Sequence, residues 1–253
     1  MTDTLKILHY SDLHGKLPQI PKKFWFTDVT IALTGDICNN YPYQTFTPGI
    51  KQGTLFTPTN WQVWNYRKID TALEAQLQNQ WVEEKLIPHF EKCGIKLENM
   101  IVLNGNHDWA DFEKYFPNAL RLGAKTILYR GIKIGLLTGV NSIAGEWNDE
   151  ITELGFERRI KELDPDIEIL LTHAGPYGIK DGGYGSREIA KAIYGQTSAE
   201  IPYFRNLKLH LFGHAHGYRG AHRDTIETEL GKREVRFYNA AETRFEIDFL
   251  VGQ

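Results

Sequence analysis

The hydrophobic positions of the chain fall into short runs, and each run stops at a polar or glycine-containing turn. Residues 5–10 form the first run, and similar runs end just before Gly35, Asn104, His173 and Gly213. Short apolar runs rich in β-branched and aliphatic residues, bounded by turn residues, are typical of strands. The pattern therefore predicts five strands, each with a polar turn at its carboxyl end.

Other patterns lie between and after these strands. Residues 124–140 contain two apolar runs joined around Arg130 and Gly131, which predicts a hairpin. Helical spacing of apolar residues predicts helices at 149–163 and at 186–194, the latter with a serine cap.

A longer helix is predicted over 69–93, and residues 233–242 and 243–250 alternate as exposed or edge strands do. The apolar residues expected on or near one face of the long helix are Leu73, Leu77, Trp81 and Leu86. Strands that alternate with helices, and are then followed by further strands, predict an α/β fold whose layers are built on two sheets.

A long segment at about 40–68 interrupts this order. It is rich in threonine, proline and aromatic residues and carries few charges. Loops of such length inside a compact domain are more often functional than plain connections. Because the chain has 253 residues and 42% hydrophobic residues, it can bury one large core. We therefore expect a single domain over 1–253 with an inserted aromatic loop.

Composition excludes several classes of protein. A formal net charge of −3 argues against a generally basic nucleic-acid binder. No secretory signal pattern and no apolar run long enough for a membrane span is visible in the sequence. The two cysteines, Cys38 and Cys93, are far apart and have no metal-site spacing, which fits a reducing compartment. We therefore expect a cytoplasmic protein.

The turns after the five strands carry metal-type side chains, namely carboxylates, one amide and imidazoles. The carboxyl ends of strands in open α/β sheets converge on one crevice. Such a mixed oxygen and nitrogen set suits manganese, iron or zinc. The predicted ligands are Asp12, His14, Asp36, Asn106, His173, His214 and His216.

Asp36 is the candidate bridging ligand, because two cations that share one carboxylate would each have about four protein ligands. Each motif is weak when taken alone. A D-x-H pattern is common by chance, and a single histidine at a strand end is more often a hydrogen-bonded core residue. Their occurrence together, each at a strand end, predicts a dinuclear metal site.

In these five blocks, which span residues 12–216, the chain resembles the calcineurin-like metallophosphoesterase superfamily. The resemblance implies a four-layer α-β-β-α sandwich. It also implies that His107 is the catalytic histidine, and it leaves Asp108 as a second candidate catalytic residue. One metal would be held by Asp12, His14, Asp36 and His216, and the other by Asp36, Asn106, His173 and His214.

Departures from family patterns narrow the choice of branch. Asn39 stands where purple acid phosphatases carry a tyrosine ligand, and the Asp-Arg-Gly of protein Ser/Thr phosphatases is absent after Asp36. The segments around His173 and His214 are similar to those of MPPED-like metallophosphodiesterases, although Ala174 intrudes in the first of them. The resemblance therefore favours a phosphodiesterase over a protein phosphatase.

The expected reaction is hydrolysis of a nucleotide or cyclic nucleotide diester with two divalent transition-metal ions, manganese being preferred to iron or zinc. A bridging hydroxide would attack phosphorus, and protonated His107 would donate to the leaving oxygen. The expected partner is thus a small phosphodiester, and neither a membrane nor duplex nucleic acid. The alternatives are a DNA repair-type metallonuclease, against which the acidic pI stands, and a non-catalytic metal-binding scaffold, against which the complete ligand set stands.

Overall fold

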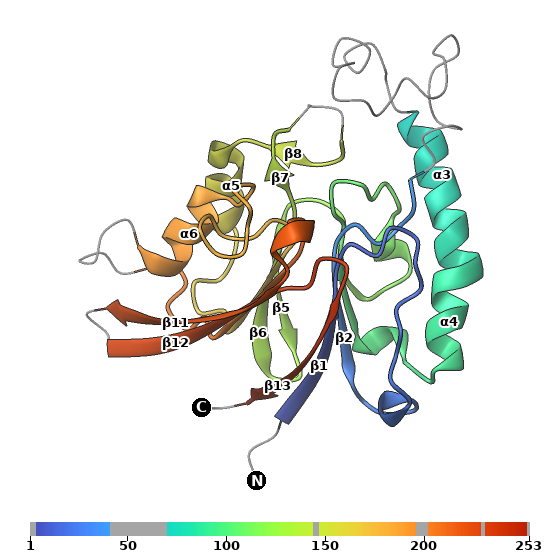
Figure 1. Ribbon diagram of the computed structural model, residues 1–253, viewed down its shortest axis with the longest axis horizontal. Coiled ribbons are helices and arrows are strands. Elements are labelled where there is room, and N and C mark those ends of the chain that lie inside the picture. The colour runs from blue at the N-terminus through green and yellow to red at the C-terminus, as the bar shows by residue number, and fades with distance from the viewer. Residues whose placement is uncertain (1–3, 41–69, 144–146, 196–201, 229–230, 252–253) are drawn as a thin grey trace.

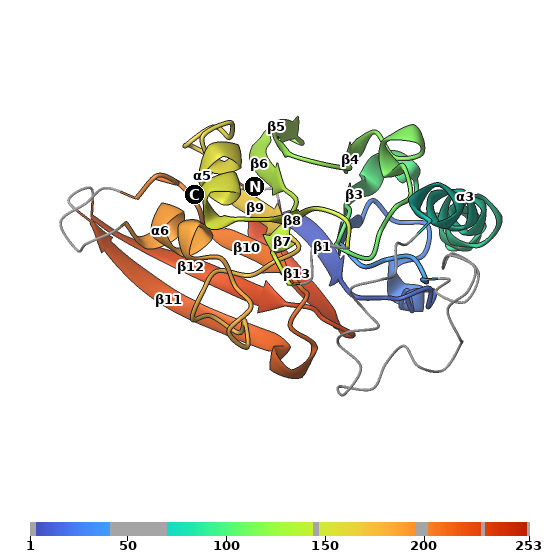
Figure 2. The same cartoon turned by 90° about the horizontal axis from the view of Figure 1, so that it is seen from above.

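Two large sheets lie face to face, and helices cover the outer face of each (Figures 1 and 2). The computed structural model describes residues 4–40, 70–143, 147–195, 202–228 and 231–251. The predicted four-layer α-β-β-α sandwich is confirmed. Apart from Asn40, the predicted insertion at about 40–68 lies outside the described residues.

The first sheet contains five strands in the order β13-β1-β2-β3-β4. Neighbouring strands from β1 to β4 are parallel, and β13 is antiparallel to β1. The parallel strands are short and almost wholly buried because both faces of the sheet are covered. The strands are β1 (Thr4–Tyr10), β2 (Thr30–Thr34), β3 (Met100–Leu103), β4 (Asn118–Leu120) and β13 (Arg244–Leu250).

The second sheet contains six strands in the order β11-β12-β10-β9-β6-β5. Its three central pairings are parallel, and the predicted hairpin forms the antiparallel β5–β6 edge. The strands are β5 (Ala124–Tyr129), β6 (Ile132–Leu137), β9 (Ile169–Thr172), β10 (Leu209–Phe212), β11 (Gly220–Thr228) and β12 (Gly231–Asn239). The sequence pattern did not predict β11, because its mixed charges carry little hydrophobic periodicity.

Two pairs of helices cover the sheets (Figure 1). On the first sheet, α3 (Thr71–Trp81) continues through a π-helical turn, η2 (Val82–Leu86), into α4 (Ile87–Lys92). On the second sheet lie α5 (Glu153–Ile160) and α6 (Arg187–Tyr194). No helix within the described ranges has both the length and the apolar character needed to span a bilayer.

Side-chain caps define where these helices begin. Ser186 accepts a hydrogen bond from the amide of Ile189 and starts α6 where the sequence predicted. Thr152 caps α5, which therefore begins later than predicted. The preceding residues form the short strand β8 (Glu150–Ile151), which pairs with β7 (Val140–Asn141).

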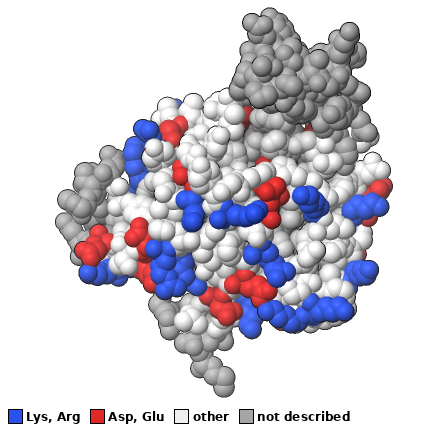
Figure 3. Space-filling view, viewed as in Figure 1, with Lys and Arg blue, Asp and Glu red and all other residues white. Residues whose placement is uncertain are grey.

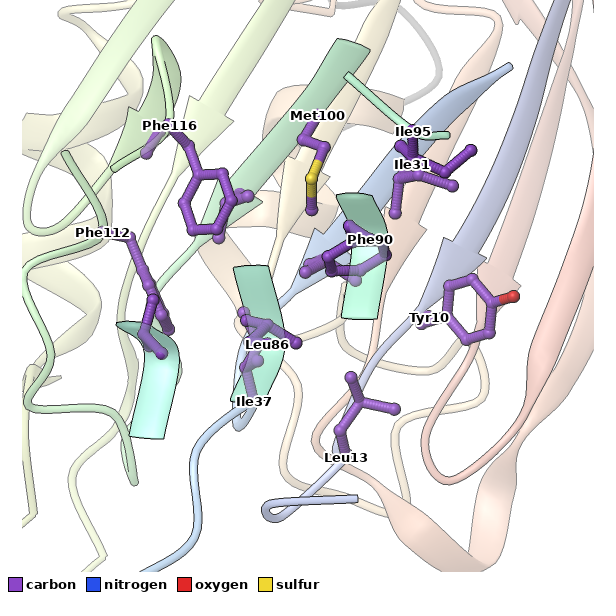
Figure 4. Packing of buried hydrophobic residues seen from close by; sticks show 14 of the residues in the cluster. Tyr10, Leu13, Ile31, Ile37, Leu86, Phe90, Ile95, Met100, Phe112 and Phe116 are labelled. Carbon is purple, nitrogen blue, oxygen red and sulfur yellow. The ribbon is translucent and has the colours of Figure 1, made fainter. Parts of the chain in front are cut away.

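The core has three layers, one between the sheets and one under each pair of helices. In the layer beneath the α3–α4 helix, Phe90 and Leu86 belong to one buried cluster with Tyr10, Ile31 and Met100 of the first sheet (Figure 4). Burial of aliphatic and aromatic side chains on this scale is the main force that holds helices on a sheet.

The buried face of α3 differs from the predicted one. Leu73 and Leu77 are only partly buried, whereas Glu74 and Gln78 are 1% and 0% exposed. The reason is that this face does not cover apolar strand residues alone. It also covers the turn after β3, whose backbone groups need polar partners.

Candidate metal centre

The predicted ligands come together at the carboxyl ends of strands from both sheets. Asp12, Asp36 and Asn106 follow β1, β2 and β3 of the first sheet. His173 and His214 follow β9 and β10 of the second. The site therefore lies across the edge where the two sheets meet, and it needs both of them.

The first group of donors consists of Asp12, His14 and His216, which offer ligand atoms within 4.8 Å of one another. Nε2 of His216 lies 2.9 Å from Oδ1 of Asp12. Nε2 of His14 lies 3.4 Å from Nε2 of His216. Two imidazole nitrogens and a carboxylate oxygen thus face the same small volume, as ligands of one cation do.

The second group consists of Asp36, His173 and His214, again within 4.8 Å of one another. Oδ1 of Asn106 lies 3.2 Å from Nε2 of His173 and adds an amide oxygen to the group. Nδ1 of His173 is 2.7 Å from the carbonyl oxygen of Thr34 and donates to it. This contact keeps a proton on Nδ1, so Nε2 is the atom that would bind a metal, with release of its own proton.

Asp36 lies between the two groups. Its Oδ2 is 3.3 Å from Nε2 of His173 and 3.9 Å from Nε2 of His14. Its Oδ1 accepts a hydrogen bond of 2.8 Å from the amide of His107. One carboxylate oxygen of Asp36 therefore faces both donor groups, and its role as a bridging ligand stays a prediction.

Backbone strain is concentrated at these residues. Four of the nine non-glycine residues with positive φ in the described part of the chain are predicted ligands: Asp12, His14, Asp36 and His214. Such conformations cost about 1–3 kcal/mol each and cluster at functional sites. The loops hold them through backbone hydrogen bonds, such as the 3.0 Å bond from the amide of Asp12 to the carbonyl of Gly35.

Two glycines permit the close approach of the loops. A Cβ on Gly35, whose φ is +95°, would lie 2.4 Å from Nδ1 of His173. A Cβ on Gly213 would lie 1.9 Å from Oγ of Ser11 and 2.3 Å from Oδ2 of Asp12. Any side chain at either position would displace a predicted ligand or its neighbour.

The electrostatics of the site fit cations. Burial opposes ionisation of Asp36, but His173 and His107 outweigh it and hold the pKa of this carboxyl well below its usual range. Burial also works against a charged His173, but Asp36 outweighs it and raises the pKa of His173 to about 10. Burial lowers the pKa of His214 to about 4, which leaves a neutral imidazole. A buried, ionised carboxylate surrounded by imidazoles is the donor chemistry of divalent transition metals.

His107 stands beside this site without belonging to either donor group. Its ring lies 5.3 Å from the ring of His14 and 4.1 Å from the ring of Trp147, measured between centroids. Nδ1 of His107 is 2.6 Å from Oδ1 of Asn40. Burial lowers the pKa of His107, and the charge of Asp36 partly offsets this effect.

The sequence did not single out the residues that hold His107. Nδ2 of Asn40 and Nε2 of Gln78 both donate to the carbonyl of His107, at 3.1 and 2.8 Å. Oε1 of Gln78 accepts from the amides of Trp109 and Ala110. Two polar residues on the inner face of a helix, Glu74 and Gln78, were the available signal, because they break its apolar pattern.

Asp108 is fully buried and its carboxylate faces backbone amides. Oδ1 accepts hydrogen bonds from the amides of Ile37 and Cys38 at 2.9 and 2.8 Å, and Oδ2 accepts from the amide of Gly105 at 2.9 Å. Burial and the nearby Asp36 raise the pKa of Asp108 to about 7. These contacts favour a positioning role, and the direct catalytic role suggested by the sequence stays a prediction.

Similarity to known proteins covers most of the chain. A family model for the calcineurin-like phosphoesterases matches residues 5–218. None of the curated proteins compared with the chain matches it.

Two solved structures resemble the whole chain. The crystal structure of a 5'-nucleotidase precursor from Thermus thermophilus has 11% sequence identity and a TM-score of 0.38, over 98% of this chain and 54% of that one. The structure of the Haemophilus influenzae NAD nucleotidase has 12% identity and a TM-score of 0.42, over 99% of this chain and 54% of that one. The chain spans about half the length of either protein.

Proposed function

The chain belongs to the calcineurin-like phosphoesterase family, and from this premise we propose that it is a dinuclear metal-dependent phosphodiesterase that acts on a nucleotide or cyclic nucleotide diester. The observation that carries the proposal is the position of Asp36. Its Oδ2 faces both donor groups, while its Oδ1 holds the amide of His107, so the proposed metals and acid share one support.

The residues of the site have separate tasks in this proposal. Divalent cations bound by the two donor groups would lower the pKa of water and neutralise charge on the phosphoryl oxygens. His107 would donate a proton to the leaving oxygen, because its ring borders the first group through His14 and an imidazole suits proton transfer near neutrality. Asn40 would hold the ring in place through Nδ1.

Several finer features belong to the same proposal. The likeness around His173 and His214 to the MPPED-like enzymes supports a diester over a monoester substrate. The mixed ligand set supports manganese, with iron or zinc as alternatives. Acidic and basic side chains are interspersed over the described part of the face in Figure 3, which supports a small substrate over duplex nucleic acid. Two free, buried cysteines, Cys38 and Cys93, support a cytoplasmic location.

The test is reconstitution of the metal-free protein with Mn²⁺, Fe²⁺ or Zn²⁺, followed by elemental analysis and a substrate panel. The panel compares p-nitrophenyl phosphate, bis-p-nitrophenyl phosphate, 2',3'-cyclic nucleotides and linear DNA. We expect two ions per chain and the highest kcat/KM with nucleotide diesters. A preference for the monoester would overturn the diesterase assignment, and preference for DNA would favour the nuclease.

The variant Asp36→Asn separates an enzyme from a scaffold. Removing the shared charge should lower both metal content and activity, because each donor group loses its common carboxylate. If the unmodified protein binds fewer than two ions and hydrolyses none of the substrates, it is the non-catalytic scaffold.

A further inference from the structure

Tyr184 is a large aromatic side chain that stands exposed beside the second donor group. Its ring centroid lies 6.0 Å from that of His214, at an interplanar angle of 87°. The side chain is nevertheless 55% exposed. The ring of Tyr184 contacts the predicted ligand His214, and the rest of the side chain is open to solvent. Much of the ring is therefore available to a bound molecule.

The loop that carries Tyr184 is held firmly by its own hydrogen bonds. The amide of Tyr184 donates to the carbonyl of Asp181 at 2.9 Å, and the amide of Gly185 donates to Oδ2 of Asp181 at 3.1 Å. Asp181 is itself buried. At the two ends of the loop, Pro176 and Ser186 pair in an isolated β-bridge that closes it. These contacts fix the backbone of the loop, which reduces the ordering that a ligand must impose on it.

A second tyrosine of the same loop, Tyr177, is exposed to a similar extent but, within the described residues, does not contact a predicted ligand. Tyr177 is 48% exposed, and its ring lies 5.1 Å from the guanidinium carbon of Arg187, a surface cation–π contact. Tyr184 faces a predicted metal ligand instead. The two rings share loop, residue type and exposure, and they differ in whether they border the centre.

Two further aromatic side chains, Tyr218 and Trp147, lie near predicted residues of the centre. Tyr218, two residues after the ligand His216, is 53% exposed and packs against Gly182, where a Cβ would lie 2.5 Å from its ring. Trp147 contacts His107 on the side of the proposed acid. Exposed aromatic rings that border a polar site are suited to binding a planar group by stacking.

We propose that Tyr184 stacks on the base of a nucleotide whose phosphate lies at the metal centre; this inference rests on the proposed function and names its substrate class. In a nucleotide one sugar separates the base from the phosphate. In the structure the ring of Tyr184 contacts the ring of the predicted ligand His214, so a phosphate at the centre would bring its base near Tyr184. Stacking of a base on an aromatic side chain contributes roughly 5- to 150-fold in binding. Any planar group could stack in this way, so the experiment separates a nucleobase from a simple aryl ester.

The test compares thymidine 5'-(p-nitrophenyl phosphate) with methyl p-nitrophenyl phosphate, which have the same leaving group. In the manganese-loaded enzyme, Tyr184→Ala should lower the ratio of kcat/KM for the thymidine ester to that for the methyl ester by roughly tenfold, mainly through KM. Tyr184→Phe, which keeps the ring, should restore the ratio. Tyr177→Ala is the matched control and should leave the ratio as in the unmodified protein.

Three results would overturn the inference. The first is an unchanged ratio in Tyr184→Ala, and the second is an equal change in Tyr177→Ala. The third is an equal loss with phenyl p-nitrophenyl phosphate, which would show that the ring binds aryl groups in general. Metal analysis of each variant shows whether a loss comes instead from disturbance of His214.

Failure of the proposed function would appear differently. If the unmodified protein hydrolyses neither ester, the phosphodiesterase assignment fails, and binding still tests Tyr184. Calorimetry of the manganese-loaded protein would then compare thymidine 5'-monophosphate with methyl phosphate. Tyr184→Ala should weaken only the binding of the nucleotide, and equal affinity of variant and unmodified protein for both would overturn the inference.

Discussion

Oδ1 of Asn40 lies 2.6 Å from Nδ1 of His107, and Nδ2 of the same side chain donates to the His107 carbonyl at 3.1 Å. An amide oxygen can only accept, so this contact places a proton on Nδ1. One neutral side chain thereby fixes both the backbone and the ring of the proposed general acid. A carboxylate in this place would also accept from Nδ1 and would stabilise the charged imidazolium, but it could not donate to the His107 carbonyl.

Replacement of Asn40 should reduce turnover without loss of metal. In Asn40→Ala the His107 ring loses its orienting partner, and we expect kcat to fall roughly 10- to 100-fold while two ions remain bound. Asn40→Asp keeps the acceptor for Nδ1 but loses the donor to the His107 carbonyl, so we expect less loss of kcat than in Asn40→Ala. The remaining activity should extend to higher pH, because the added carboxylate raises the pKa of His107 and keeps the acid protonated. Steady-state kinetics over a pH range of about 5–9 measures both effects. Loss of metal in Asn40→Ala would contradict the positioning role.

His107→Ala should separate proton donation from metal binding. We expect both ions to remain and activity on a nucleotide diester with a poor leaving group to fall by about 10²–10⁴-fold. The loss should shrink for p-nitrophenyl esters, because p-nitrophenolate leaves without protonation. Rates for a series of leaving groups of graded pKa measure this dependence. A uniform loss over the series would show that His107 positions the phosphate instead.

Asp108→Asn should affect stability and metal affinity more than turnover. The substitution turns one of two accepting oxygens into a donor that faces backbone N–H groups of Ile37, Cys38 or Gly105. We expect the free energy of unfolding of the metal-free protein to fall by about 1–3 kcal/mol. Urea unfolding measures this loss, and Glu113→Gln, an exposed carboxylate nearby, serves as control. Full stability combined with loss of turnover at saturating metal would instead support catalysis by Asp108.

The buried His210 should lower the free energy of unfolding of the metal-free protein as the pH falls into mild acid. Burial lowers the pKa of this histidine from 6.5 to about 3, and its Nε2 bonds with Oγ1 of Thr172 at 2.9 Å. The unfolded chain therefore takes up a proton below about pH 6.5 that the folded protein does not, so stability falls as pH falls from about 6.5 toward 3. For this group the change between about pH 7 and pH 5 is about 2 kcal/mol.

The measurement is urea unfolding of the unmodified protein and of His210→Gln at both pH values, with a chelator present. Glutamine has no titration in this range and keeps a polar atom near Thr172. The loss between about pH 7 and pH 5 should be smaller in the variant by about 2 kcal/mol. Equal losses in the two proteins would show that His210 does not remain neutral in the fold.

The sequence by itself determined the five strands that lead to the predicted ligands and the residues that follow those strands, whereas β11 had no sequence signal. Five apolar runs end at Asp12, Asp36, Asn106, His173 and His214, and the structure brings all five ends together. These features are local, because a strand and the turn that ends it occupy consecutive residues, and strand ends converge by a general rule of α/β folds. The residues in those turns also carry the resemblance to the calcineurin-like superfamily, and that resemblance predicted the four-layer sandwich.

Only the tertiary structure decided what supports these residues. Gln78 is 29 residues from the His107 carbonyl that it binds, and Asn40 is 67 residues away. Neither belongs to a motif, and their polarity on a buried surface has meaning only once the helix is packed on the turn. The contacts that favour a positioning role for Asp108 are visible only in the folded chain, and no sequence pattern pointed to Tyr184 before its ring was found beside His214. Contacts between distant segments depend on packing, which a linear pattern does not encode position by position.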